Sequence, residues 1–218
     1  MAGVCGIEFG VCAIRVTRVD AVGNVIAGNN AYVTDKVINV GVNVNKETGQ
    51  TFSLRNGCGC SLVRFRSFDV FNWFEFSLVK AGLEPELEAF LLGAALVTDG
   101  PDKVGIAYPG AIDCEDSEPA VAFEFWTKQL VGSAQSAQFP WVHHVYPYTT
   151  WSLGNNTHSE EPFQETVDGF SRTNSLWGDG PYGDGPPNGV YIGEGAWWET
   201  DVEPPTEECN ALPVTATS

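Results

Sequence analysis

Segments in which apolar and polar residues alternate recur along this chain, and they restrict it to a fold built mainly from β-strands. Residues 36–45, KVINVGVNVN, alternate valine or isoleucine with asparagine or glycine, and residues 10–20, GVCAIRVTRVD, alternate similarly. Successive side chains of a strand point to opposite faces, so each segment can bury one face. The sequence therefore predicts several short strands between residues 10 and 45.

The next stretch predicts a hairpin and a further strand. Residues 51–80 read as two strands around an Asn-Gly turn, followed by a third strand, VFNWFEFSLV. In the second strand, Val63 and Phe65 share one face, and Arg64 and Arg66 share the other. The third strand carries apolar residues at both parities, as in a strand covered on both sides.

One helix is predicted, at residues 85–97. Pro85 suits a first-turn position, and acidic residues lie near the positive N-terminal end. Leu87, Phe90 and Leu91 follow at helical spacing. The turn sequence TDGPD then ends the helix.

The length and charge of the chain indicate how many domains it forms and which ligands it disfavours. It has 218 residues, 43% of them hydrophobic, which is enough for one domain with a sizeable core. The net charge is -17, and residues 101–218 hold 18 of the 28 acidic residues but only 3 of the 11 basic ones. Such a chain repels phosphate backbones, because nucleic-acid binding depends on Lys and Arg. Solubility alone also explains this charge.

The cysteines and histidines indicate neither a metal site nor a catalytic site. Cys58-Gly59-Cys60 lacks zinc-knuckle spacing, so we expect reduced thiols with no metal between them. His143 and His144 lie in an extended segment, FPWVHHVYPYTTW, and adjacent strand residues face opposite sides. They cannot then bind one ion, and His158 lies beyond a turn. The other cysteines, expected to be free thiols, are Cys5, Cys12, Cys114 and Cys209.

The last third of the chain is rich in glycine, proline, tryptophan and acid. In WGDGPYGDGPP, Asp179 and Asp184 resemble a calcium loop only loosely, and a glycine-rich surface loop is favoured. Neither a signal peptide nor a transmembrane helix is expected, because no basic start precedes an apolar run and no long apolar stretch occurs.

The order of these segments resembles a known family. LRNGCGCSLVRFRSFDVFNWFEFSLVKAGLEPELEAFLLGAALV is followed by FEFWTKQLVG and then by FPWVHHVYPYTTWSLGNNTHSEEPFQETVDGFSRTNSLWGDGPYG. This succession resembles the major tail tube proteins of long, flexible-tailed bacteriophages, especially those of actinobacterial hosts. The resemblance covers roughly residues 50–190 and rests on no single short motif.

The resemblance implies a β-sandwich or partly closed β-barrel with one flanking helix, extended loops and terminal arms. Residues 1–203 would form one tail tube-like domain, and residues 204–218 a flexible or partner-ordered tail. Such proteins form sixfold rings that stack into a tube around the tape-measure protein, between tail terminator and tail tip proteins. They are assembled in the host cytoplasm and belong to the virion. The resemblance supplies no catalytic residue, cofactor or membrane contact.

A tube that passes double-stranded DNA would benefit from carboxylates on its inner wall, which repel phosphates. Glu75 and Glu124 are polar positions in strongly β segments, and Glu124 lies on the face opposite to Phe123 and Phe125. They are the candidates for acids that face the lumen.

Two other readings stay open. One is a carbohydrate-binding or carbohydrate-acting β-sandwich, in which Trp177, Trp197 and Trp198 would stack on sugars and a Glu/Asp pair would act as acid and base. The other is a different structural protein of the virion.

Overall fold

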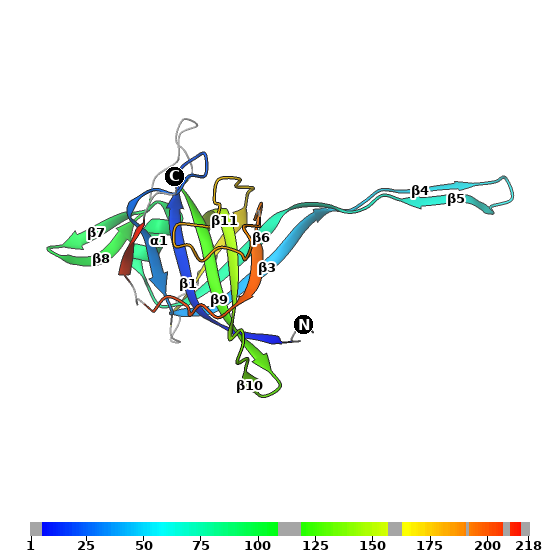
Figure 1. Cartoon of the computed structure of the whole chain (residues 1–218). Coiled ribbons are helices and arrows are strands. Elements are labelled where there is room, and N and C mark those ends of the chain that lie inside the picture. The colour runs from blue at the N-terminus through cyan, green and yellow to red at the C-terminus, as the bar shows by residue number, and fades with distance from the viewer. Residues whose placement is uncertain (1–5, 109–118, 157–162, 191, 207–209, 215–218) are drawn as a thin grey trace.

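The computed structural model describes residues 6–108, 119–156, 163–190, 192–206 and 210–214. These residues form a β-rich body from which a long hairpin extends (Figure 1). The elements are β1 (Ile7–Val19), β2 (Gly28–Thr34), β3 (Val37–Glu47), β4 (Thr51–Arg55), β5 (Ser61–Arg66), β6 (Val70–Ala81), α1 (Pro85–Leu92), β7 (Ala95–Asp99), β8 (Asp102–Ala107), β9 (Ala120–Val131), β10 (Ala134–Gln135), β11 (Trp141–Leu153), β12 (Gln164–Ser171), β13 (Ala196–Thr200) and β14 (Asn210–Val214).

Ten strands form one antiparallel sheet, which confirms the predicted mainly-β class. Eight of them follow the order β14-β2-β1-β9-β11-β12-β6-β3, while β10 pairs with β9 and β13 pairs with β11. The sheet must curve: Val11 of β1 and Val40 of β3 pack against the same core, although four strands lie between β1 and β3 in the sheet. The result is an open, sandwich-like fold whose two long margins approach each other without pairing among the described strands.

The central strands are covered on both faces. Phe123 and Phe125 of β9 point into the inner core together with residues of α1, whereas Ala122 belongs to a second core on the outer face. That second core is covered in part by the segment between β12 and β13, which contributes Trp177, and by β14. The predicted glycine-rich surface loop is therefore a packed layer over the sheet.

Helix α1 begins at Pro85, as predicted, but it ends at Leu92 rather than near residue 97. Gly93 adopts a left-handed conformation with φ 65°, which stops the helix, and a Cβ there would lie 2.9 Å from the Pro119 side chain. Residues 95–107 form the β7–β8 hairpin instead, whose turn is the predicted TDGPD sequence. No helix within the described residues is long and apolar enough to span a membrane.

The helix packs its apolar side chains into the inner core, which leads to a stability prediction. Leu91 is fully buried there, so Leu91→Ala is expected to lower the free energy of unfolding by about 2 to 5 kcal/mol through lost contacts and a cavity. Leu83→Ala is the matched control, because Leu83 is 67% exposed and its truncation should change stability by less than about 0.5 kcal/mol. Chemical denaturation of both variants measures the difference, and equal midpoints would contradict the packing.

Residues 210–214 differ from the expected flexible or partner-ordered tail. Asn210–Val214 form strand β14, which pairs antiparallel with β2 and so extends the main sheet. Leu212 and Val214 are buried in the outer core. The described part of this segment therefore belongs to the domain, because its apolar side chains cover the outer face of the sheet.

Candidate functional site

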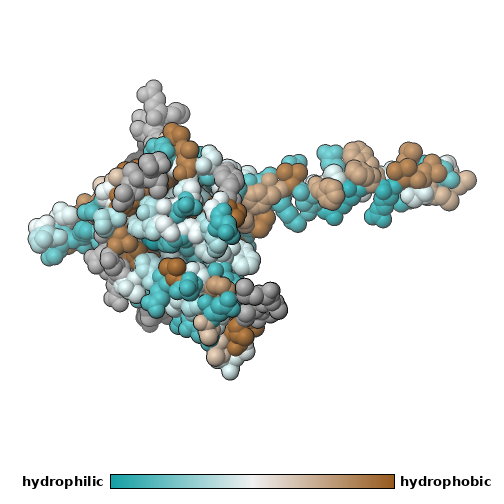
Figure 2. Space-filling model, in the orientation of Figure 1, coloured by the Kyte–Doolittle hydropathy of each residue, from teal (hydrophilic) through white to brown (hydrophobic). Residues whose placement is uncertain are grey.

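The β4–β5 hairpin, together with residues 56–60 at its tip, forms an arm (Figure 1). The arm leaves the body after the last residue of β3 and returns to it at the first residue of β6. Every residue of β4 and β5 is exposed. Figure 2 shows brown, hydrophobic residues along its length, and Phe52, Leu54 and Phe65 are each about 60% exposed. The hairpin was predicted from its turn and alternation, but its separation from the body was not.

Pairing within the arm places most of its apolar side chains on one face, although Leu62 shares the face of Arg64 and Arg66. Phe52 lies opposite Phe65 and Leu54 lies opposite Val63. Because directly opposed residues share a face, these four form one apolar face. Arg64 and Arg66, predicted to lie on the other face of their strand, are opposite Ser53 and Thr51. The arm is therefore an amphipathic ribbon whose apolar face has no cover within the described chain.

The tip of the arm is a tight turn. The side-chain oxygen of Asn56 accepts hydrogen bonds from the backbone N–H groups of Cys58 (3.1 Å) and Cys60 (2.9 Å). Gly59 has φ +82°, a conformation that favours glycine. Both cysteines are exposed free thiols, and their lack of zinc stays a prediction that elemental analysis checks.

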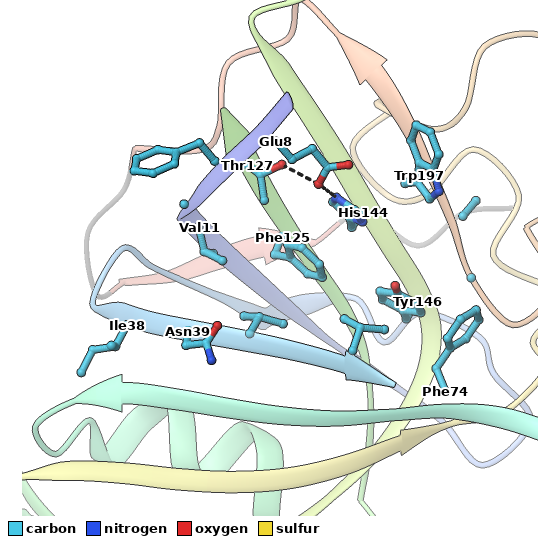
Figure 3. Close-up of a pocket in the computed structure, with 16 residues that line it drawn as sticks. Glu8, Val11, Ile38, Asn39, Phe74, Phe125, Thr127, His144, Tyr146 and Trp197 are labelled. Carbon is cyan, nitrogen blue, oxygen red and sulfur yellow. Dashed lines mark hydrogen bonds and ion pairs between the residues drawn. The ribbon is translucent and has the colours of Figure 1, made fainter. Parts of the chain in front are cut away.

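A groove opens at the seam between the margins of the sheet (Figure 3). It has a volume of about 530 Å³ and lies between the start of β1 and the first half of β3, over β9, β11 and β13. Its floor is apolar and includes Phe125, Tyr146 and Phe74. Phe9 and Trp197 are 66% and 62% exposed, so the groove presents unburied apolar surface.

One polar cluster sits inside the groove. Glu8 Oε2 lies 2.9 Å from His144 Nε2 and accepts a 3.1 Å hydrogen bond from Thr127 Oγ1 (Figure 3). The His144 ring stacks on Phe125 with 4.3 Å between centroids. Burial lowers the pKa of His144, although the Glu8 carboxylate opposes this shift. Burial and the nearby charge of Glu8 raise the pKa of Tyr146 to about 12. His144 is therefore held as part of the groove wall.

His143 faces the opposite side of β11, as the strand prediction required. Its ring stacks on Trp126, with centroids 4.1 Å apart, and contacts Trp198 edge-on at 4.7 Å. Its Nε2 atom lies 3.3 Å from Glu124 Oε1 but makes no well-aligned hydrogen bond. The two histidines thus serve separate clusters on the two faces of the sheet.

Glu124 is buried, which corrects its assignment to the lumen. Its carboxylate accepts hydrogen bonds from Arg15 Nε (2.7 Å) and Nη2 (2.8 Å), and Arg15 also donates to Asp184 (2.8 Å). Burial alone would raise the pKa of Glu124, but Arg15 and His143 lower it to about 2. A carboxylate that is 1% exposed cannot line a channel.

The arrangement of Glu124, His143 and Asp184 also bears on whether a metal ion or calcium could bind there. Ligand atoms of Glu124, His143 and Asp184 lie within 4.8 Å of one another. The Arg15 guanidinium already bridges both carboxylates and lies 3.8 Å from the Tyr182 ring centroid, so a cation there would meet a fixed positive charge. Asp184 anchors its loop to the sheet rather than forming a calcium loop.

Glu75, the other candidate acid, is exposed on β6. It accepts hydrogen bonds from Asn45 Nδ2 (2.7 Å) and Trp73 Nε1 (3.4 Å). With Asp168 and Phe170 of β12 it lines a shallow hollow of about 720 Å³. Val70, Phe71 and Trp73 are 57%, 42% and 39% exposed, so β6 is not covered on both sides near the arm. That Glu75 faces a lumen stays a prediction.

The tryptophans proposed for sugar stacking do not form a common platform. Trp177 is 2% exposed and packs in the outer core, and Trp198 is half-buried against His143. Only Trp197 of the three is largely exposed, at 62%. The arrangement gives no support to a carbohydrate reading built on these residues.

The carboxylates of Glu88 and Glu165 lie close together, as an acid and base pair would require, but they are buried. Lys80 Nζ lies 2.7 Å from Glu88 Oε1 and 2.5 Å from Glu165 Oε2, and all three side chains are at most 2% exposed. Burial and the neighbouring Glu88 raise the pKa of Glu165 to about 7, although Lys80 opposes this shift. Because a substrate cannot reach them, these residues tie α1 to β6 and β12 rather than forming an acid and base pair.

No protein-family model matches this chain, and no curated protein matches it in sequence.

Proposed function

We propose that this protein is a structural virion protein that assembles into stacked hexameric rings, which form the hollow tail tube of a long-tailed bacteriophage. One observation carries the proposal. The arm exposes a continuous apolar face that the described chain does not cover. A surface of this kind is typical of a protein whose folded state is completed by contacts with other copies.

The arm on its own is a ribbon of only two strands. A single two-stranded hairpin is marginally stable in water and needs a third layer or strand. The arm has neither within the described residues, since β4 and β5 pair only with each other. A neighbouring subunit supplies the missing layer, and the apolar face then becomes buried.

The open margins of the sheet support the same function. Among the described strands, β3 pairs only with β6, and the start of β1, before Ile14, pairs only with β9. Unpaired edges favour association with other strands, and a closed ring removes them. These edges, together with the arm, suit a subunit that contacts copies on more than one side.

The charge suits a conduit for DNA. With a net charge of -17, the assembled wall repels phosphate, so the genome passes without adhering. Glu75 is an exposed acid available to the lumen, whereas Glu124 is not. The tape-measure protein, tail terminator and tail tip proteins are the proposed partners, and the virion is the proposed location.

The test is electron microscopy of the purified protein beside an arm variant. The wild type is expected to form rings or tubes with a hollow centre at high concentration. Phe52→Asp with Phe65→Asp should prevent them while leaving the melting temperature of the body unchanged, because both side chains are exposed. Val22→Asp, at a position 72% exposed on the body, is the matched control and should assemble normally.

A wild type that remains monomeric at every concentration would contradict the proposed function. Rings or other oligomers that never stack into tubes would favour a different structural protein of the virion.

A further inference from the structure

We propose that the groove at the seam of one copy receives the apolar face of the arm of a second copy. This inference rests on the proposed function, in which copies of the chain contact each other. It names the surface on which the arm docks and the partner that fills the groove.

The two surfaces match in chemistry. The arm offers four apolar side chains on one face, with Phe52 opposite Phe65 at its base. The groove offers an apolar floor and an exposed apolar rim, where Phe9, Ile38 and Trp197 are 66%, 49% and 62% exposed. Each surface exposes apolar area to water when alone, and their contact removes both from water.

Charge favours a second copy as the occupant. Residues 51–68, which span the arm, contain three of the chain's 11 basic residues and none of its 28 acidic ones. The rest of the chain therefore holds all 28 acidic residues, and one of them, Glu8, lies at the groove itself. Arg66 pairs with Asp69 at the base of the arm (2.8 Å), so Arg55 and Arg64 carry the remaining positive charge of the arm. A basic arm on an acidic body is attracted, whereas two bodies alone repel.

The positions of the two surfaces on one strand make the contact directional. The groove uses residues 38–42 in the first half of β3, whereas the arm begins beyond Glu47, the last residue of that strand (Figure 1). The arm extends away from the body, so it docks on another copy rather than on its own. A surface and its complement at two different places on one subunit give a head-to-tail contact, which propagates into rings or tubes.

Unpaired backbone flanks the groove as well. Within the described strands, the start of β1 pairs only with β9, and the edge of β3 that faces it pairs with no strand. An arm seated between them can pair an outer strand with one of these edges, so that strand addition accompanies side-chain burial.

Photo-crosslinking in the assembled protein tests the docking. Phe52 is replaced by a benzophenone-bearing phenylalanine analogue, assembled material is irradiated, and the linked peptides are identified by mass spectrometry. The expected links join position 52 to the groove of another copy, at or beside Phe9, Ile38 or Trp197. Links to a different surface, in material that still forms rings or tubes, would overturn the docking and leave the proposed function standing.

A groove variant gives an independent measurement. Ile38→Asp is expected to raise the protein concentration needed for assembly by about tenfold or more, because a charge enters an apolar contact. Its melting temperature should stay close to that of the wild type, since Ile38 is half-exposed in the free subunit. The matched control is Val22→Asp, which should leave that concentration unchanged. Equal effects of the two variants would overturn the docking site, and failure of the wild type to assemble would overturn the docking and the proposed function together.

Discussion

Replacing Lys80 with methionine is expected to destabilise the protein by about 3 to 5 kcal/mol at pH 8, because removal of one partner leaves buried charge without compensation. Lys80 is fully buried and is the cation that holds Glu88 and Glu165 together. In Lys80→Met, both carboxyls must either ionise without a cation or stay protonated at a pH well above their usual pKa. The loss should therefore be smaller at pH 5 than at pH 8. Denaturant unfolding at the two pH values measures it.

The wild-type cluster has a pH dependence of its own. The pKa of Glu165 is raised from 4.5 to about 7 in the folded state, so the folded protein holds this proton more tightly than the unfolded chain. Its contribution to stability is complete below pH 4.5 and is lost as the pH rises through 7. Glu165→Gln is expected to remove this dependence and to be at least as stable as the wild type at pH 8, because Lys80 and Glu88 remain a matched pair.

The two variants together identify the cause. A Lys80→Met variant that is equally destabilised at pH 5 and pH 8 would show that lost packing, rather than buried charge, dominates. The double variant Lys80→Met with Glu165→Gln should recover part of the loss at pH 8, because one uncompensated carboxylate is removed.

Arg15→Met is expected to cost about 3 to 5 kcal/mol at neutral pH by the same principle at a different site. Arg15 is 4% exposed and donates two hydrogen bonds to the buried Glu124 and one to Asp184. Burial alone would lower the pKa of Arg15, but the two carboxylates raise it, so the guanidinium stays charged. The variant leaves Glu124 buried without its cation and releases the loop that Asp184 anchors.

Three controls accompany this variant. Arg15→Lys keeps the charge but loses the two-pronged contact, so an intermediate loss is expected. Arg15→Met with Glu124→Gln should recover much of the loss, because the buried charge is gone. Arg64 lies on the exposed arm, so Arg64→Met should change the stability of the body by less than about 0.5 kcal/mol. Equal midpoints for Arg15→Met and Arg64→Met would contradict the buried ion pair.

The pKa of Glu124 adds a second readout. It is depressed from 4.5 to about 2, so this group contributes stability above pH 4.5 that is lost as the pH falls through 2. In Arg15→Met the pKa of Glu124 should rise, because burial is then opposed only by His143. The difference between variant and wild type should therefore shrink as the pH is lowered from 7 to 4.

Local patterns in the sequence determined many of the strands, though not β7 or β14, and which side chains share a face. The alternation in residues 36–45 is strand β3, and the Asn-Gly turn at residues 56 and 57 closes the β4–β5 hairpin. The opposite placement of His143 and His144 followed from strand geometry alone. These features depend on neighbours within a few residues, which the sequence displays directly.

The tertiary structure decided which faces are covered. Glu124 looked like an exposed acid because alternation places it opposite to Phe125, but Arg15, 109 residues away in sequence, neutralises it beneath a packed loop. The arm and the groove became visible only when the ends and margins of β3 were placed in space. Alternation with a period of two shows only that the two faces of a strand differ. Which face is buried depends on segments far away in the chain, and the local sequence does not show which segments pack together.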